Sequence, residues 1–149
     1  DAAGRARIQR AANAGAIEAV AAAMRAYPDV EDVQKMGCWA LVNVCFGTDA
    51  AGLARVQRAA DAGAIEAIVA ALQAHPQVAI VQQKGCEALG NVCFGDDAAG
   101  RARIQRAADA GAIEARRRSA RGGGDAGSPT GGEGAGEQLL GAGQRVLGQ

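Results

Sequence analysis

The sequence predicts an all-α protein, a right-handed α-solenoid of stacked three-helix repeats. The segment DAAGLARVQRAADAG at residues 49–63 recurs almost unchanged at 1–15 and 97–111, so the chain repeats itself every 48 residues. Alanine supplies much of the apolar content and only four residues are aromatic, which favours close-packed helices over sheets. A repeat of this length is typically one small unit that buries its apolar face by stacking on its neighbours.

The period divides the chain into repeats and a tail. The first repeat covers residues 1–48, the second covers 49–96, and the start of a third covers 97–115. Residues 116–149 are rich in glycine and arginine. We expect this tail to be disordered, because it cannot bury enough apolar surface to become ordered.

Each repeat begins with a short helix that has an aspartate before it and a glycine at its end. In the second and third repeats these residues are Asp49 with Gly63 and Asp97 with Gly111. Aspartate is a preferred N-terminal cap and glycine a preferred residue after a helix C-terminus, so these residues predict where the helix begins and ends. The arginines of the RARIQR motif at 101–106 are predicted to form a solvated face.

The second helix follows at once and is amphipathic. In AIEAIVAALQA, Ile65, Ile68 and Leu72 recur at helical spacing and form one apolar face. The pairs Tyr27-Pro28 and His75-Pro76 end this helix, because the residue before a proline is pushed away from helical dihedrals.

The third helix is predicted from about 30 to 46 and from about 78 to 94, with Asp29 as the cap of the first copy. A glycine recurs inside it at Gly37 and Gly85. Glycine within a helix costs roughly 1 kcal/mol relative to alanine, so its recurrence predicts that a neighbouring helix passes too close for a methyl group.

The joint pattern of the second and third helices resembles the armadillo repeat. The residues that carry it are ADAGAIEAIVAALQAHPQVAIVQQKGCEALGNVC at 60–93 and NAGAIEAVAAAMRAYPDVEDVQKMGCWALVNVC at 13–45. The resemblance covers residues 1–115 and implies that the third helices line a groove that binds extended peptides. The period exceeds the usual armadillo length of about 40 to 47 residues, so a HEAT-like repeat is the alternative.

The resemblance also implies ligand-binding residues on the third helices. The family holds its ligand with a W-x-x-x-N pair, and Trp39 with Asn43 stands at that spacing, whereas the second repeat has Glu87 with Asn91. An asparagine can bond a peptide backbone, and Glu87 would favour a cationic ligand. In the alternative interpretation the asparagines brace the helices and Trp39 is packed.

Protein binding is therefore the predicted function, and we expect the ligand to be a protein or an extended peptide. The alternatives are recognition of basic nuclear-localisation peptides, as the resemblance to importin-alpha implies, and a scaffold or regulatory segment of a larger protein. No catalytic residue, cofactor or metal site is predicted. His75 occupies a turn where the first repeat has Tyr27, and the sequence shows no nucleophile with a base and no phosphate loop.

Four cysteines lie on the third helices: Cys38, Cys45, Cys86 and Cys93. Each pair within a helix is separated by about 10 Å of helical rise, whereas a disulfide needs alpha carbons within about 7 Å. Pairs between repeats are the alternative, but we expect all four to be unpaired and packed in or near the core. Unpaired thiols indicate an intracellular protein, either cytoplasmic or nuclear.

Charge and hydropathy argue against two partner classes. Residues 1–115 carry slightly more acidic than basic side chains, so nucleic-acid binding is predicted only through the segment Arg116–Arg121. No apolar run is long enough to cross a membrane. Because the third repeat stops in mid-helix, Ile104 and Ile113 are expected to be exposed at an apolar end.

The tail carries a second hypothesis, that it is a third repeat read out of frame. With permitted codons, LLGAGQRVLGQ at 139–149 gives CWALGNVCLG one base later, which matches CWALVNVCFG at 38–47. The same shift turns RRRSAR at 116–121 into AAALRA, which matches AAAMRA at 21–26. The nucleotide sequence tests this hypothesis.

Overall fold

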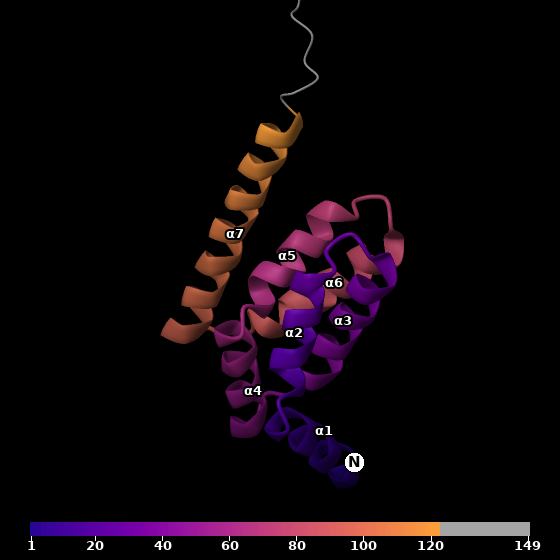
Figure 1. Cartoon of the computed structure of the whole chain (residues 1–149). Coiled ribbons are helices and arrows are strands. Elements are labelled where there is room, and N and C mark those ends of the chain that lie inside the picture. The colour runs from indigo at the N-terminus through magenta and orange to yellow at the C-terminus, as the bar shows by residue number, and fades with distance from the viewer. Residues whose placement is uncertain (123–149) are drawn as a thin grey trace, which may run out of the picture. The chain divides into compact units, whose positions relative to one another are not determined.

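The computed structural model describes residues 1–122, and these form seven helices and no strand (Figure 1). The all-α class is therefore confirmed for this part of the chain. The residues up to Arg117 form one compact body. The helices are α1 (Ala2–Asn13), α2 (Ala16–Ala26), α3 (Glu31–Val44), α4 (Ala50–Asp61), α5 (Ala64–Ala74), α6 (Ala79–Val92) and α7 (Ala98–Gly122).

The first helix of each repeat is capped by the predicted aspartate. The backbone N–H of Gly52 donates to the Asp49 carboxylate at 2.7 Å, and that of Gly100 donates to Asp97 at the same distance. At the other end, Gly15 and Gly63 have φ angles of 88° and 81°. Because side chains rarely adopt this backbone conformation, glycine allows the chain to turn at once into α2 and α5.

Helix α7 differs from α1 and α4 because it runs straight through Gly111, where the sequence predicted an end. In the sequence, Arg116 and Arg117 stand where the second repeat has Ile68 and Val69. The segment after Gly111 therefore lacks the apolar face that folds α5 back onto its neighbours. The helix extends instead.

The tail predicted from residue 116 accordingly begins within a helix. Helix α7 continues to Gly122, so the first residues of that predicted disordered segment are helical. The remainder of the tail, together with most of the frame-shift hypothesis, lies outside the described residues.

The third helices begin without a capping side chain, so the prediction of an Asp29 cap was wrong. The residue before α3 is Val30, and no side chain bonds to its first turn. Gln34, which is buried, instead ties the second helix to the third. Its Nε2 donates to the carbonyl oxygens of Met24 and Tyr27 at 2.9 and 2.7 Å. Gln82 bonds the end of α5 in the same way.

The repeats pack through equivalent helices, α3 on α6 and α2 on α5 (Figure 1). The two helical glycines mark a close approach within each repeat, as predicted. A Cβ built at Gly37 would lie 2.5 Å from Met24 Cγ, and one at Gly85 would lie 2.6 Å from Leu72 Cδ2. Both distances are shorter than real side-chain contacts, so each second helix needs a glycine on the third.

Two arginines of the first helices join consecutive repeats, and for Arg103 the prediction of a solvated face was wrong. Arg55 is only 6% exposed. Its guanidinium donates to the carbonyl oxygens of Val44 and Phe46 and to Gln9 Oε1, at 2.8, 3.0 and 2.8 Å. One period later Arg103, equally buried, donates to the Phe94 carbonyl and to Gln57.

Ion pairs repeat with the same period. Arg58 of the second repeat pairs with Glu18 of the first, and Arg106 pairs with Glu66. The hydrogen bond from Arg58 lowers the pKa of the Glu18 carboxyl. The first helices α4 and α7 are thus each bound to the second helix of the preceding repeat.

The cysteines are free, but they are not all buried as predicted. Cys38 and Cys45 are buried, whereas Cys93 is half-buried and Cys86 is exposed. The difference arises because the second repeat covers the cysteines of the first, and no described residue covers Cys86 in the same way. Burial raises the pKa of the Cys38 and Cys45 thiols to about 11.

Thiol reactivity should follow this order. At pH 8 a thiol with pKa about 11 is only ~0.1% thiolate, so Cys38 and Cys45 should react with Ellman's reagent only after unfolding. Cys86 should give the fast phase in the native protein. Changing Cys86 to serine should remove that phase alone, and four equal rates in the native protein would contradict the structure.

The remaining expectations on exposure are met. Ile104 and Ile113 are 53% and 47% exposed, as predicted for an apolar end. No helix within residues 1–122 is both long and apolar enough to cross a membrane.

Candidate functional site

The four site residues predicted from the sequence lie on α3 and α6, the two neighbouring third helices. Trp39 is 47% exposed, so about half of its surface is covered by neighbouring residues and half is open to a ligand. Lys84 of α6 places its Nζ 5.6 Å from the centre of the Trp39 ring. This is a cation–π contact between the two repeats.

Glu87 belongs to the same cluster. Its carboxylate accepts a hydrogen bond from Lys84 Nζ at 2.8 Å, and a longer one from Gln83 Nε2. The bond from Lys84 lowers the pKa of the Glu87 carboxyl below its ordinary value. An exposed indole, an ammonium and a carboxylate therefore meet on one surface, and Lys84 links the other two.

The two asparagines make bracing contacts, as the alternative interpretation expected. Asn43 Nδ2 donates to the Trp39 carbonyl one turn earlier, at 3.1 Å. Asn91 Nδ2 donates across the repeats to the Val42 carbonyl, also at 3.1 Å. An amide has two N–H groups and a carbonyl oxygen, so each asparagine retains bonding capacity beyond its described bond. Asn43 is exposed, whereas Asn91 is half-buried.

Sequence reasoning missed Lys84. Its position in the second repeat corresponds to Met36 in the first, so the period gave no reason to single it out. Only the packing of α6 beside α3 brings it over Trp39. A basic residue one helical turn before Glu87 was the available signal, because residues three apart on a helix are neighbours.

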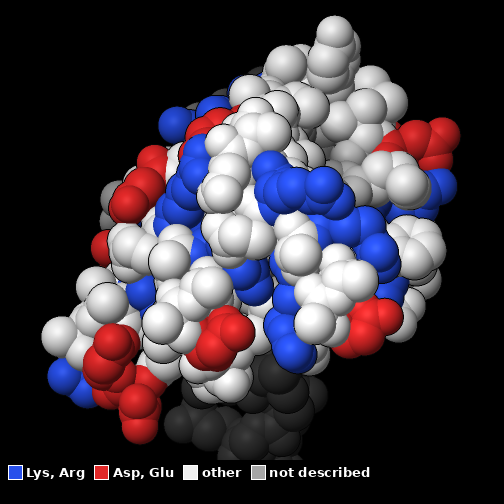
Figure 2. All heavy atoms as spheres, turned by 90° about the horizontal axis from the view of Figure 1, so that it is seen from below, with Lys and Arg blue, Asp and Glu red and all other residues white. Residues whose placement is uncertain are grey.

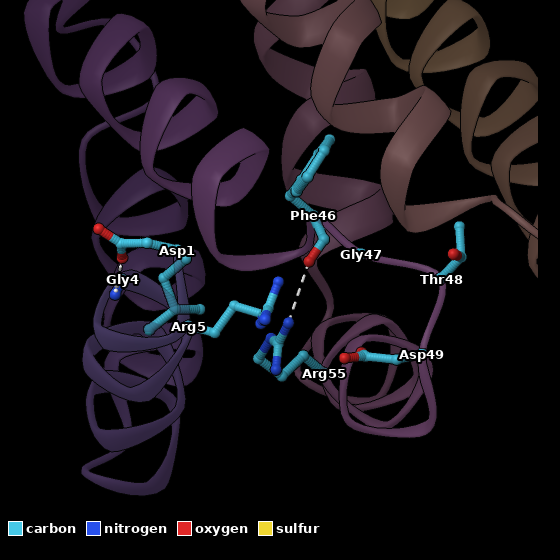
Figure 3. Close-up of a pocket in the computed structure, with 9 residues that line it drawn as sticks. Asp1, Gly4, Arg5, Phe46, Gly47, Thr48, Asp49 and Arg55 are labelled. Carbon is cyan, nitrogen blue, oxygen red and sulfur yellow. Dashed lines mark hydrogen bonds between the residues drawn. The ribbon is translucent and has the colours of Figure 1, made fainter.

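A cavity of about 400 Å³ opens between the start of α1 and the loop from α3 to α4 (Figure 3). Figure 3 shows the guanidinium groups of Arg5 and Arg55 extending into it. Arg55 already donates to two carbonyls and to Gln9. Asp49 caps α4. Of the polar groups at this cavity, Arg55 and Asp49 therefore hold the loop between the repeats.

Basic side chains gather on the face seen from below, on the side where α1 and α4 lie (Figure 2). The exposed contributors from α1 are Arg5, Arg7 and Arg10. The corresponding arginines of the second repeat, Arg55 and Arg58, are bound to groups of the first repeat. All three arginines of α1 are therefore exposed, whereas in α4 Arg55 is buried and Arg58 is half-buried.

Within residues 1–122, no three His, Cys, Asp or Glu side chains gather in an arrangement that could hold a metal ion. Comparisons of the chain with models of known families, with curated proteins and with solved structures found no match.

Proposed function

We propose that this chain is a protein-binding module that holds an extended peptide along the surface of its third helices. In this proposal the three-helix repeats are of armadillo type and stack as a right-handed solenoid. The adjacent packing of α3 and α6 and the links between repeats support it. The free thiols favour a place of action inside the cell.

The exposed Trp39 carries the proposal. Tryptophan is enriched where proteins bind partners, since its large ring is buried on binding and its N–H can bond to the ligand. Here it lies beside Lys84 and Glu87, and Asn43 stands one turn farther along α3. A peptide side chain can stack on the indole while the amides bond its backbone.

Glu87 favours a peptide with a basic residue, the chemistry of the nuclear-localisation alternative. Such a residue has to compete with Lys84, which already lies over Trp39 and bonds Glu87. We therefore expect peptides with one basic residue among apolar or neutral ones, rather than long basic runs.

Trp39 also provides the measurement, because it is the single tryptophan of the chain. Peptides selected from a random display library against the native protein should shift its fluorescence on titration. Changing Trp39 to alanine should weaken their binding at least ~10-fold, as for a central interface residue. Affinity for that variant is measured by calorimetry, because it has no tryptophan.

The matched control is Tyr27→Ala, which removes another exposed aromatic ring outside the third helices. This variant should bind the selected peptides unchanged. Changing Glu87 to glutamine should weaken only peptides that contain lysine or arginine. Equal binding to the native protein and the Trp39 variant would refute the proposed groove.

A further inference from the structure

An apolar groove of about 280 Å³ lies on the outer side of the first repeat, between α2 and α3. Its lining is almost entirely apolar: Val20, Ala23, Met24, Val33, Met36 and Gly37. Met36 is 55% exposed. No described residue outside α2 and α3 lines this groove.

The second repeat contains the same groove, and there the first repeat covers it. Ala71 is 2% exposed and Val81 is fully buried. Their counterparts one period earlier, Ala23 and Val33, are exposed and half-buried. The packing of the first repeat on the second therefore shows that this groove accepts a third helix with the surface of α3.

On the opposite side of the stack, the described residues leave the same surface of α6 uncovered. On α3, Cys38 and Leu41 are buried to 0% and 1% exposure. On α6, their counterparts Cys86 and Leu89 are exposed and half-buried. An added Cβ at Gly90 would meet nothing within 4 Å, so there is open space at this part of α6.

We propose that the groove of the first repeat binds a second copy of this chain, through the α6 surface that carries Cys86 and Leu89. The two chains then meet head to tail, and their contact repeats the α3–α6 packing within one chain. Within one chain Asn91 donates to the Val42 carbonyl. In the contact between two copies, the equivalent Asn43 of one copy donates to the Gly90 carbonyl of the other.

Helix α7 occupies the position that α1 of the second copy would need. The sequences of the two helices are so similar that α1 can make the same contacts there as α7. Residues 2–13 and 98–109 differ only at Asn13 and Asp109. When α1 displaces α7, Arg10 replaces Arg106 in the ion pair with Glu66. The lost and gained contacts are equivalent, whereas the cover over Cys86 and Leu89 is new.

Head-to-tail contacts use two different surfaces and do not close on themselves, so they build open chains of protomers. Light scattering under reducing conditions should give a mass for the 149-residue protein that rises with concentration beyond a dimer. Ala23→Arg blocks the groove, and Cys86→Arg blocks the α6 surface. Both residues are exposed in one chain, so circular dichroism should show that the fold is retained.

Each variant alone should lose association by at least ~30-fold, because a guanidinium is buried without a partner. An equimolar mixture should form a dimer that does not grow, since the open α6 surface of one variant meets the open groove of the other. Self-association of either variant would indicate a symmetric contact and overturn the proposal. A native protein that stays monomeric, including one whose own tail covers the groove, would overturn it too.

Discussion

Gly52→Ala should destabilise the protein more than alanine at Gly85 or Gly90, the other two helical glycines of the second repeat. A Cβ at this position would lie 2.4 Å from the carbonyl oxygen of Gly47 and 2.6 Å from its carbonyl carbon. These are backbone atoms, so no side-chain rotation can relieve the clash. Gly47 itself has a φ of 120°, which favours glycine, so the loop has little freedom to adjust.

We expect the free energy of unfolding to fall by about 3 kcal/mol or more, and Tm to fall by on the order of 10 °C. Urea denaturation followed by circular dichroism measures the first quantity, and a thermal melt the second. A stability within experimental error of the native protein would show that this loop moves freely.

Gly90 provides the matched control, because it is also a helical glycine and the same substitution should have the opposite sign. A Cβ at Gly90 meets nothing within 4 Å, and the residue is exposed in the last turn of α6. Alanine should therefore stabilise the protein by up to about 1 kcal/mol through its higher helix propensity. If both variants shift stability in the same direction, the contact between Gly47 and Gly52 does not account for the result.

The elements that sequence reasoning placed correctly are those determined by neighbours in the chain. An aspartate before a helix bonds the N–H three residues later, so Asp49 and Asp97 could be identified as caps without a fold. The second helices were predicted from the spacing of their apolar residues and from the prolines after them. Even the close approach at Gly37 was predictable, because a glycine that recurs within a helix needs a cause.

The errors concern residues whose partners lie in another helix or another repeat. Arg103 was placed toward solvent with the rest of its motif, yet it is buried and bonds the Phe94 carbonyl and Gln57 of the preceding repeat. Cys86 was expected in or near the core because free cysteine is usually buried, but no described residue covers it as the second repeat covers Cys38. Trp39 was identified from the resemblance, whereas Lys84 could be recognised only from packing.

Changing Arg55 to methionine should have the other large effect, because it removes three hydrogen bonds of a buried side chain, one of them to Gln9 of the first repeat. The substitution retains an apolar side chain but leaves the carbonyls of Val44 and Phe46 and the Gln9 amide without their donor. Losing a buried charged donor of this kind costs about 2–4 kcal/mol of folding free energy. Urea denaturation should show this fall in stability.

Arg7 is the matched control, because it is the same residue of the repeat one period earlier. It is exposed and takes part in none of the hydrogen bonds described for residues 1–122, so Arg7→Met should change stability by no more than about 0.5 kcal/mol. Arg55→Lys should fall between the two, since an ammonium retains the charge but not the planar fork of donors. Equal losses from Arg7 and Arg55 would mean that these arginines act through helix propensity. Unequal losses would mean that a single side chain has a structural role only where a preceding repeat supplies its acceptors.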